Sequence, residues 1–301
     1  MTAWSRRQFI GVSLRSGIGL AAAGLASCRS LEILSGKGGS QMRFGLVTYL
    51  WAKDWTLPTL IRNCEITKTY GVELRTQHAH GVEANLTNGE RRDVKKRFAD
   101  SPVILVGLGT NFAFHYTDAQ KVRANIEDAK KYVKLSYDVG GTGVKVKPNG
   151  LPSDVPVEKT IEQIGTSLNE LGKFAADYGQ QIRVEVHGRE TQQLPIIKRI
   201  FDVVDQRNVG ACWNCNDQDL AGKGLEYNFN LVKDRLGATV HVRKLNIGSY
   251  PYQQLMNLFV RMNYRGWILM EARTHPADRV KALAEQKVIF DRMLAQAQQL
   301  V

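Results

Sequence analysis

The sequence predicts an α/β protein that folds as a single-domain (β/α)8 TIM barrel behind an N-terminal signal and tether. Eight runs rich in β-branched residues alternate strictly with eight amphipathic segments, which is typical of a parallel sheet covered by helices. The length of 301 residues suits one closed barrel. No Gly-x-Gly-x-x-Gly motif follows the first strand, where an open dinucleotide-binding sheet would carry one, so the closed barrel is the better prediction.

The barrel is expected to occupy residues 43–301 as a series of strand–helix units. Each strand segment is a short β-branched run, whereas each helical segment has the spacing of an amphipathic helix. The expected strands are 43–49, 71–76, 103–109, 143–148, 181–187, 208–214, 238–245 and 266–272. The expected helices lie near 57–70, 89–99, 118–137, 156–179, 191–204, 226–236, 251–264 and 276–299.

Residues 1–27 have the pattern of an export signal. Arg6-Arg7 precedes an apolar stretch that is too short and too rich in glycine to be a permanent membrane span. The arginine pair resembles a twin-arginine signal, and Leu25-Ala26-Ser27-Cys28 resembles a bacterial lipobox, in which the cysteine is acylated. We therefore expect export by the twin-arginine route and a lipoprotein anchored to the membrane through Cys28, in the periplasm or at the cell surface. The alternative is a plain cleaved signal in which Cys28 is incidental.

Residues 28–42 are expected to form a flexible tether, because they are rich in glycine and serine. The whole chain is basic, with 41 Lys and Arg against 29 Asp and Glu and a formal net charge of +12. No basic run is interleaved with aromatic residues, so the excess indicates anionic small molecules or surfaces and not nucleic acid.

Alternation along the strands predicts which side chains face the barrel axis. In 181–187, Val184 and Val186 alternate with Arg183, Glu185 and His187, and the other strands show the same pattern. The apolar set must face the helices, so the polar set points inward. The inward polar residues near the C-terminal strand ends are Glu73, Arg75, Lys145, Lys147, Glu185, His187, Asn214, His241, Arg243 and Glu271. Such a set must form ion pairs, bind a metal or line a wet pocket, at the end where these barrels place active sites.

Four of these residues predict a metal site. Glu185, Asn214, His241 and Glu271 lie at the ends of the last four strands. Two carboxylates, an imidazole and an amide oxygen suit one divalent metal ion, namely Mn²⁺, Mg²⁺, Co²⁺ or Zn²⁺. Asp217 could supply an oxygen from the loop in place of Asn214.

Short motifs at the strand ends carry a family resemblance. They are Val72-Glu73-Leu74-Arg75 with His78-Ala79-His80-Gly81, Val184-Glu185-Val186-His187-Gly188, Cys212-Trp213-Asn214-Cys215-Asn216-Asp217, Val240-His241-Val242-Arg243 and Gly266-Trp267-Ile268-Leu269-Met270-Glu271. From Phe44 onward the chain resembles the xylose-isomerase-like TIM barrel superfamily of sugar isomerases and epimerases. The resemblance implies metal ligands Glu185, Asn214, His241 and Glu271. The family pattern at the sixth strand is Asp-x-x-His, and this chain has Asn214 and Asp217 there.

The resemblance and the site together suggest proton transfer at a carbon next to a carbonyl, on a small-molecule sugar or sugar derivative. Glu185 or Glu271 would be the catalytic base, and the sequence leaves the choice open. Three functions remain: a metal-dependent sugar isomerase or epimerase, which is the leading one; a dehydratase or keto-glycoside lyase on the same metal site; and a non-catalytic carbohydrate-binding barrel at the cell surface.

We assign six residues to substrate binding by their positions at or after strand ends. They are Glu73, His80, Lys147, His187, Asp217 and Arg243. His187 could alternatively orient Glu185. Lys147 and Arg243 would bind a carboxylate or keto group of the substrate, whereas Lys145 and Arg183 could pair with buried acids.

Overall fold

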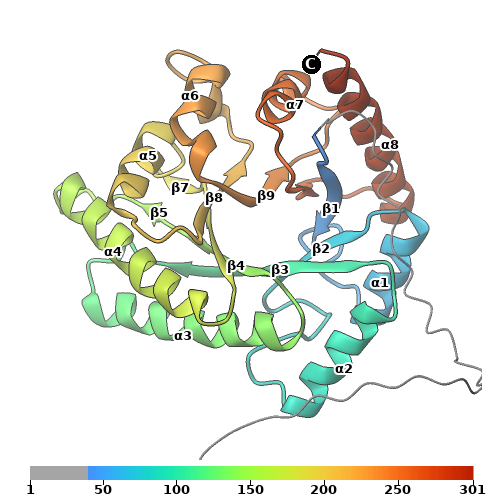
Figure 1. Ribbon diagram of the computed structural model, residues 1–301, viewed down its shortest axis with the longest axis horizontal. Coiled ribbons are helices and arrows are strands. Elements are labelled where there is room, and N and C mark those ends of the chain that lie inside the picture. Colours follow the sequence, from blue (N-terminus) through green and yellow to red (C-terminus); the bar gives the residue numbers. More distant parts are fainter. Residues whose placement is uncertain (1–39, 301) are drawn as a thin grey trace, which may run out of the picture. The chain divides into compact units, whose positions relative to one another are not determined.

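The computed structural model describes residues 40–300, and their main sheet is a closed parallel barrel (Figure 1). The sheet closes because β1 pairs with both β2 and β10. The order around the barrel is β1-β10-β9-β8-β6-β4-β3-β2, which confirms the predicted fold class. The barrel strands are β1 (Arg43–Val47), β2 (Gly71–Arg75), β3 (Ile104–Ala113), β4 (Gly143–Lys147), β6 (Gln181–Glu185), β8 (Val209–Asn214), β9 (Leu236–Val242) and β10 (Trp267–Met270).

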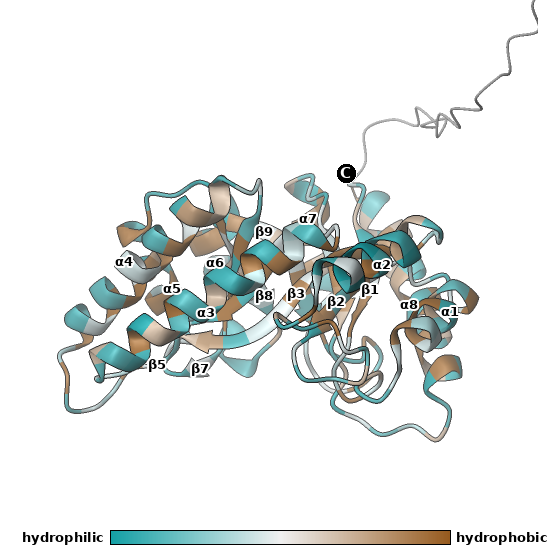
Figure 2. Ribbon diagram, turned by 90° about the horizontal axis from the view of Figure 1, so that it is seen from below, coloured by the Kyte–Doolittle hydropathy of each residue, from teal (hydrophilic) through white to brown (hydrophobic). Residues whose placement is uncertain are grey.

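Helices surround the barrel, and each predicted helical segment coincides with one to within a few residues at its ends. The α-helices are α1 (Leu57–Ile66), α2 (Asn88–Ala99), α3 (Ala119–Asp138), α4 (Val157–Ala176), α5 (Leu194–Val203), α6 (Leu225–Val232), α7 (Tyr252–Arg261) and α8 (Arg279–Gln298). Two short 3₁₀ turns, η1 (Asp217–Leu220) and η2 (Lys233–Arg235), complete the connections. In Figure 2, α2 and α3 face the viewer with mostly hydrophilic residues, as expected for an outer layer.

The larger core lies between the sheet and the helices. Val184 and Val186 are fully buried there, together with Val240 and Ile268, as the strand alternation predicted. A separate, smaller apolar cluster lies inside the barrel and consists of Val47, Val106, Trp267 and Leu269. The rest of the barrel interior is occupied by buried polar and charged side chains.

Arg183 occupies the interior near the N-terminal ends of the strands. Its guanidinium donates hydrogen bonds to the carbonyl of Val106 at 2.9 Å and to Oγ1 of Thr142 at 2.8 Å. A Cβ at Gly107 would lie 2.7 Å from a guanidinium nitrogen of Arg183, so the glycine makes room for the arginine.

A two-stranded sheet that the sequence did not predict lies beyond β4 and β6. It pairs β5 (Asn149–Gly150) with β7 (Gly188–Arg189). It brings Asn149 beside His187, and Nδ1 of that histidine lies 3.0 Å from Oδ1 of Asn149. The sheet therefore fixes one side of the barrel mouth.

The described residues begin inside the segment assigned to the tether. Ser40 and Met42 are already buried, and Ser40 donates a hydrogen bond to the carbonyl of Tyr264. The export signal, Cys28 and most of the predicted tether lie outside the described residues. Across residues 40–300, each helix falls short of the length or the hydrophobicity needed to cross a bilayer.

Candidate active site

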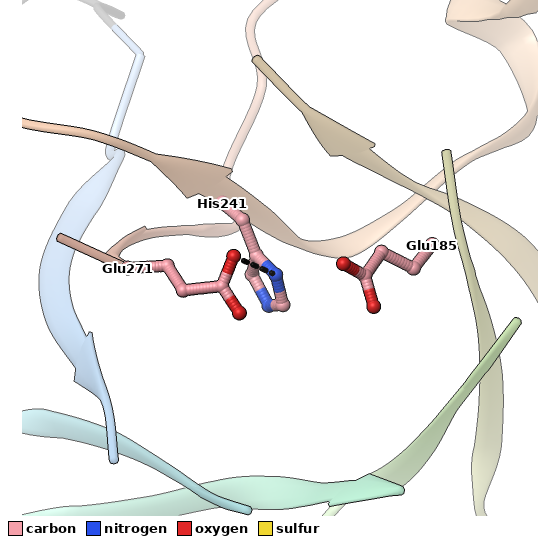
Figure 3. Close-up of side chains that lie close together, drawn as sticks. All are labelled: Glu185, His241 and Glu271. Atoms are coloured by element: carbon pink, nitrogen blue, oxygen red, sulfur yellow. Dashed lines mark ion pairs between the residues drawn. The ribbon is translucent and has the colours of Figure 1, made fainter. Parts of the chain in front are cut away.

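Glu185, His241 and Glu271 form a buried cluster near the C-terminal ends of the strands. They come from β6, β9 and the residue after β10, and one potential ligand atom from each lies within 4.8 Å of the others. Figure 3 shows the three side chains directed toward the barrel axis from separate strands. Parallel strands of a barrel bring their ends together, so residues far apart in the sequence meet here.

The carboxylate of Glu185 is held on both oxygens. Nζ of Lys145, on β4, lies 2.5 Å from Oε2, and Nδ2 of Asn214 donates to Oε1 at 3.0 Å. Nζ of Lys147 lies 3.8 Å from Oε2. Burial alone would raise the pKa of Glu185, but the charges of Lys145 and Lys147 hold that pKa well below its usual range. Glu185 is therefore a fixed, ionised carboxylate.

Lys145 is as deeply buried as its partner. The side chains of Lys145 and Glu185 are 1% and 2% exposed. Burial alone would lower the pKa of Lys145, but the carboxylates of Glu185, Glu73 and Glu271 raise it above its usual value. The sequence expectation that Lys145 pairs with a buried acid is confirmed, and that acid is a member of the cluster.

His241 lies between two carboxylates. Its Nδ1 is 3.8 Å from Oε2 of Glu271, and its Nε2 is 3.2 Å from Oε1 of Glu73. Within residues 40–300, neither ring nitrogen has an aligned hydrogen-bond partner, although both are buried. A buried imidazole in this state requires a further partner.

The cluster fits a divalent metal ion. The unpartnered Nδ1 of His241 faces the Glu271 carboxylate, and Glu185 completes a set of two carboxylates and one imidazole. Such mixed oxygen and nitrogen donors bind Mn²⁺, Mg²⁺, Co²⁺ and Zn²⁺. Asn214 lies beside Glu185 with its amide nitrogen already used. Its side-chain oxygen, Oδ1, is the atom left for a metal.

Glu271 differs from Glu185 in its surroundings. Its Oε1 lies 4.0 Å from a guanidinium nitrogen of Arg75, and among the described residues no group donates a hydrogen bond to it. Arg75 is held by two other contacts, a hydrogen bond to Oδ1 of Asn111 at 3.1 Å and a cation–π contact over Tyr49 at 4.8 Å. The Glu271 carboxylate is thus the freer of the two.

Three of the six residues assigned to substrate have polar groups on the mouth side of the cluster. Lys147 borders Glu185 with 12% of its side chain exposed. His187 is half-buried, and burial lowers its pKa to about 4, so its ring is neutral near pH 7. Arg243 donates to Oδ1 of Asn216 at 3.4 Å.

The structure places the other three elsewhere. Glu73 has no exposed surface and lies behind His241. Both ring nitrogens of His80 are used by the backbone, because Val82 N–H donates to Nδ1 at 3.0 Å and Nε2 lies 2.6 Å from the carbonyl of Arg75. Asp217 is exposed at the start of η1 and is not a member of the cluster. Arg75, which received no role from the sequence, lies 4.0 Å from Oε1 of Glu271 in the cluster.

Comparison with known proteins places this chain in a family. The sequence model of the family described as "Xylose isomerase-like TIM barrel" matches residues 67–291. No curated protein matches the chain.

Solved structures share the architecture at low sequence identity. The apo form of 3-keto-D-glucoside 4-epimerase, YcjR, from E. coli superposes with a TM-score of 0.71 at 15% identity, covering 83% of this chain and 99% of that one. An L-ribulose 3-epimerase gives a TM-score of 0.74 at 13% identity, covering 86% and 96%. The IolI protein with a binding zinc atom gives 0.72 at 13% identity, covering 85% and 99%. At these identities the likeness establishes the fold.

Proposed function

The chain belongs to the xylose isomerase-like TIM barrel family, and we propose that it is a metal-dependent enzyme that moves a proton at the carbon next to a sugar carbonyl. The observation that carries this proposal is the buried cluster of Glu185, His241 and Glu271 at the C-terminal ends of the strands. The similarity to structures of sugar epimerases supports a sugar isomerase or epimerase.

The proposed ligands are Glu185, His241 and Glu271, with the side-chain oxygen Oδ1 of Asn214 as the fourth. Positive charge from the ion would stabilise the negative charge that develops on the substrate oxygens when the neighbouring carbon loses its proton. The zinc atom bound in the IolI structure supports a metal in this fold, and the donor set here accepts several divalent ions.

Glu271 is the better candidate for the base that removes the proton. Its carboxylate accepts no hydrogen bond from the described residues, whereas Lys145 and Asn214 occupy both oxygens of Glu185. A carboxylate that must first break a buried ion pair is a weak proton acceptor. Glu185 would therefore hold its position and its charge while Glu271 accepts and returns the proton.

The same asymmetry supports a second candidate reaction. Epimerisation with two bases needs Glu185 to act from the opposite face of the substrate, and the Lys145 contact opposes this. A dehydratase or a lyase on keto-glycosides needs one base at the acidic carbon and then loses water or an alcohol. Both reactions begin with the same proton transfer, and their products distinguish them.

Proton NMR in D₂O tests the proposal on the full chain. The protein would be incubated with Mg²⁺ or Zn²⁺ and with ketoses, aldoses and keto-glycosides. The proposal expects deuterium to enter at the carbon next to the carbonyl, with inversion or isomerisation for the first candidate and with loss of water or aglycone for the second. If no substrate exchanges and the protein binds no metal, the proposed enzyme is contradicted and a non-catalytic carbohydrate-binding barrel is favoured.

Matched variants assign the base in the same assay. Glu271→Gln is expected to abolish exchange, and Glu285→Gln, at an exposed position of α8, serves as the control. Exchange that continues in Glu271→Gln and stops in Glu185→Gln would reverse the assignment.

We also propose that the protein is a lipoprotein exported by the twin-arginine route and anchored through Cys28. The arginine pair and Leu25-Ala26-Ser27-Cys28 support this. Each buried methylene of an acyl chain contributes about 0.8 kcal/mol to membrane attachment. Incorporation of labelled palmitate should be lost in Cys28→Ala, and a variant that stays equally membrane-bound would show that the anchor lies elsewhere.

A further inference from the structure

We propose that the substrate carries an oxyanion, a carboxylate or a phosphate, and that Arg75 and Lys147 bind it across the barrel mouth. This proposal rests on the proposed function, because it names the class of sugar that the same site takes.

Two of the inward cations are already neutralised or held. Lys145 is paired with Glu185 at 2.5 Å, and Arg183 donates to Val106 and Thr142 near the opposite end of the barrel. Both side chains are about 1% exposed, so a substrate has no access to them. They therefore cannot account for substrate recognition.

Arg75 and Lys147 differ from that buried pair. Their side chains are 15% and 12% exposed, which leaves a small surface open to a ligand and removes most of the surrounding water. The closest carboxylate oxygens lie 4.0 Å from Arg75 and 3.8 Å from Lys147, beyond hydrogen-bond distance. Within residues 40–300, Nζ of Lys147 donates no hydrogen bond. Both cations thus lack a close anionic partner.

Their placement on the barrel supports one shared ligand. β2 and β4 flank β3, in which Gly109 is in register with Arg75 and Ala113 is in register with Lys147. Neither of these two β3 residues has a large side chain that could separate the cations. Arg75 is held in place by Asn111 and Tyr49, so its guanidinium is preorganised for a planar or tetrahedral oxyanion.

The charge balance favours an anion. Glu185 is matched by Lys145, and Glu73 lies against His241, so Glu271 is the carboxylate left to face Arg75, and Lys147 shares Glu185 with Lys145. The proposed divalent ion would add further positive charge. A neutral sugar would leave partly buried cations without partners, which is costly, whereas an oxyanion on the substrate would pair with them.

The geometry also orients the sugar. β4 and β10 lie opposite each other in the order around the barrel, so Lys147 and Glu271 approach the axis from opposite sides. The oxyanion would lie toward β2 and β4, and the carbon that loses its proton would lie toward Glu271.

Calorimetry with matched sugars tests the inference without turnover. The full chain with Mg²⁺ would be titrated with neutral sugars and with the corresponding uronic acids and sugar phosphates. We expect at least one anionic member to bind about tenfold or more tightly than its neutral partner, and the tighter anion identifies carboxylate or phosphate. The preference should weaken as salt is added.

Variants locate the site. Lys147→Met should remove the preference for the anion and Lys147→Arg should keep it. Arg189→Met is the matched control, because this rim arginine is 83% exposed and contacts only Glu190 among the charged groups described. The inference would be overturned if anionic and neutral partners bind equally throughout the panel, or if none of them binds. It would also be overturned if the preference survives in both Lys147→Met and Arg75→Met.

The anion site and the proposed function can fail independently. A preference for anions without deuterium exchange on any sugar would contradict the proposed enzymatic activity and support the anion site. Exchange on neutral sugars with an unchanged KM in Lys147→Met would support the enzymatic activity and contradict the anion site.

Discussion

Oε1 of Glu73 lies 3.2 Å from Nε2 of His241, while Nδ1 of the same ring faces Oε2 of Glu271 at 3.8 Å. Glu73 is fully buried and cannot touch a substrate. Burial alone would raise the pKa of Glu73, but the facing imidazole and the charges of Lys145 and Arg183 keep it below its usual value. An ionised carboxylate behind a metal-binding imidazole fixes the orientation of the ring and its tautomer.

Glu73→Gln should therefore weaken metal binding while the fold is kept. The expected loss in affinity is about 10- to 100-fold, because the substitution removes the charge behind His241 and retains the side-chain volume. Competition with a chromogenic chelator measures it. Glu65→Gln, at an exposed position near the end of α1, is the control. Equal affinity in the two variants would show that Glu73 does not position the imidazole.

Gly109 provides the space that Glu73 occupies. A Cβ at this position would lie 2.8 Å from Oε1 of Glu73 and 3.1 Å from Cγ of Arg75. Gly109→Ala should lower the free energy of unfolding by about 1–3 kcal/mol and reduce metal affinity at the same time. At Gly89 in α2, a Cβ would meet nothing closer than 3.9 Å, so Gly89→Ala should leave metal affinity unchanged and stabilise the protein by up to about 1 kcal/mol. Urea unfolding of both variants checks the contrast.

The alternation of strand and helix segments predicted the barrel, and alternation along each strand predicted which side chains meet in the cluster. Val184 and Val186 lie in the outer core, which turns Glu185 inward, and the same rule places His241 inside. Each side-chain direction within a strand follows from a period of two, so one buried face determines the other. The cluster was predictable because its residues stand in or next to strands.

Alternation along the strands gives no information about residues in loops or about which inward side chains pair with each other. His80 and Asp217 follow their strands by several residues, and the loop conformation sends one into backbone hydrogen bonds and the other to the surface. Alternation showed that Lys145 points inward but could not select Glu185 as its partner, because pairing depends on the three-dimensional distance between β4 and β6. The arrangement of Asn149 and His187 depends on a two-residue strand pair that is too short to leave a pattern in the sequence.

The Lys145–Glu185 pair should show strong coupling in a double-mutant cycle. Removing either partner leaves the other charge buried, so Lys145→Met and Glu185→Gln should each cost about 3–5 kcal/mol of unfolding free energy. The double variant should recover a large part of the summed loss, because neither charge remains. The exposed pair Lys198 and Asp202 provides the comparison cycle, with an expected coupling of about 0.5 kcal/mol or less. Additive losses at Lys145 and Glu185 would contradict the pairing.

Asp219 should make the stability of the protein depend on pH near neutrality. Its Oδ2 accepts hydrogen bonds from the hydroxyl of Tyr250 at 2.6 Å and from the N–H of Asn216 at 3.0 Å. Its Oδ1 is buried without a hydrogen-bond partner among residues 40–300. Burial raises the pKa of Asp219 from 3.8 to about 7, although the two hydrogen bonds lower it in part.

The sign of the effect follows from proton binding. Between about pH 4 and pH 7 the folded protein keeps the proton on Asp219 and the unfolded chain has released it, so this group's contribution to stability falls as the pH rises and becomes constant above about pH 7.

Asp219→Asn cannot ionise. The unfolding free energy of the variant relative to the wild type should therefore increase between about pH 5 and about pH 8, by up to roughly 3 kcal/mol. Gln218→Ala, at the neighbouring position in η1, carries no ionisable group and should differ from the wild type by a constant amount. Denaturation curves at both pH values decide the point, and a difference between Asp219→Asn and wild type that does not change with pH would show that Asp219 is already ionised at the lower value.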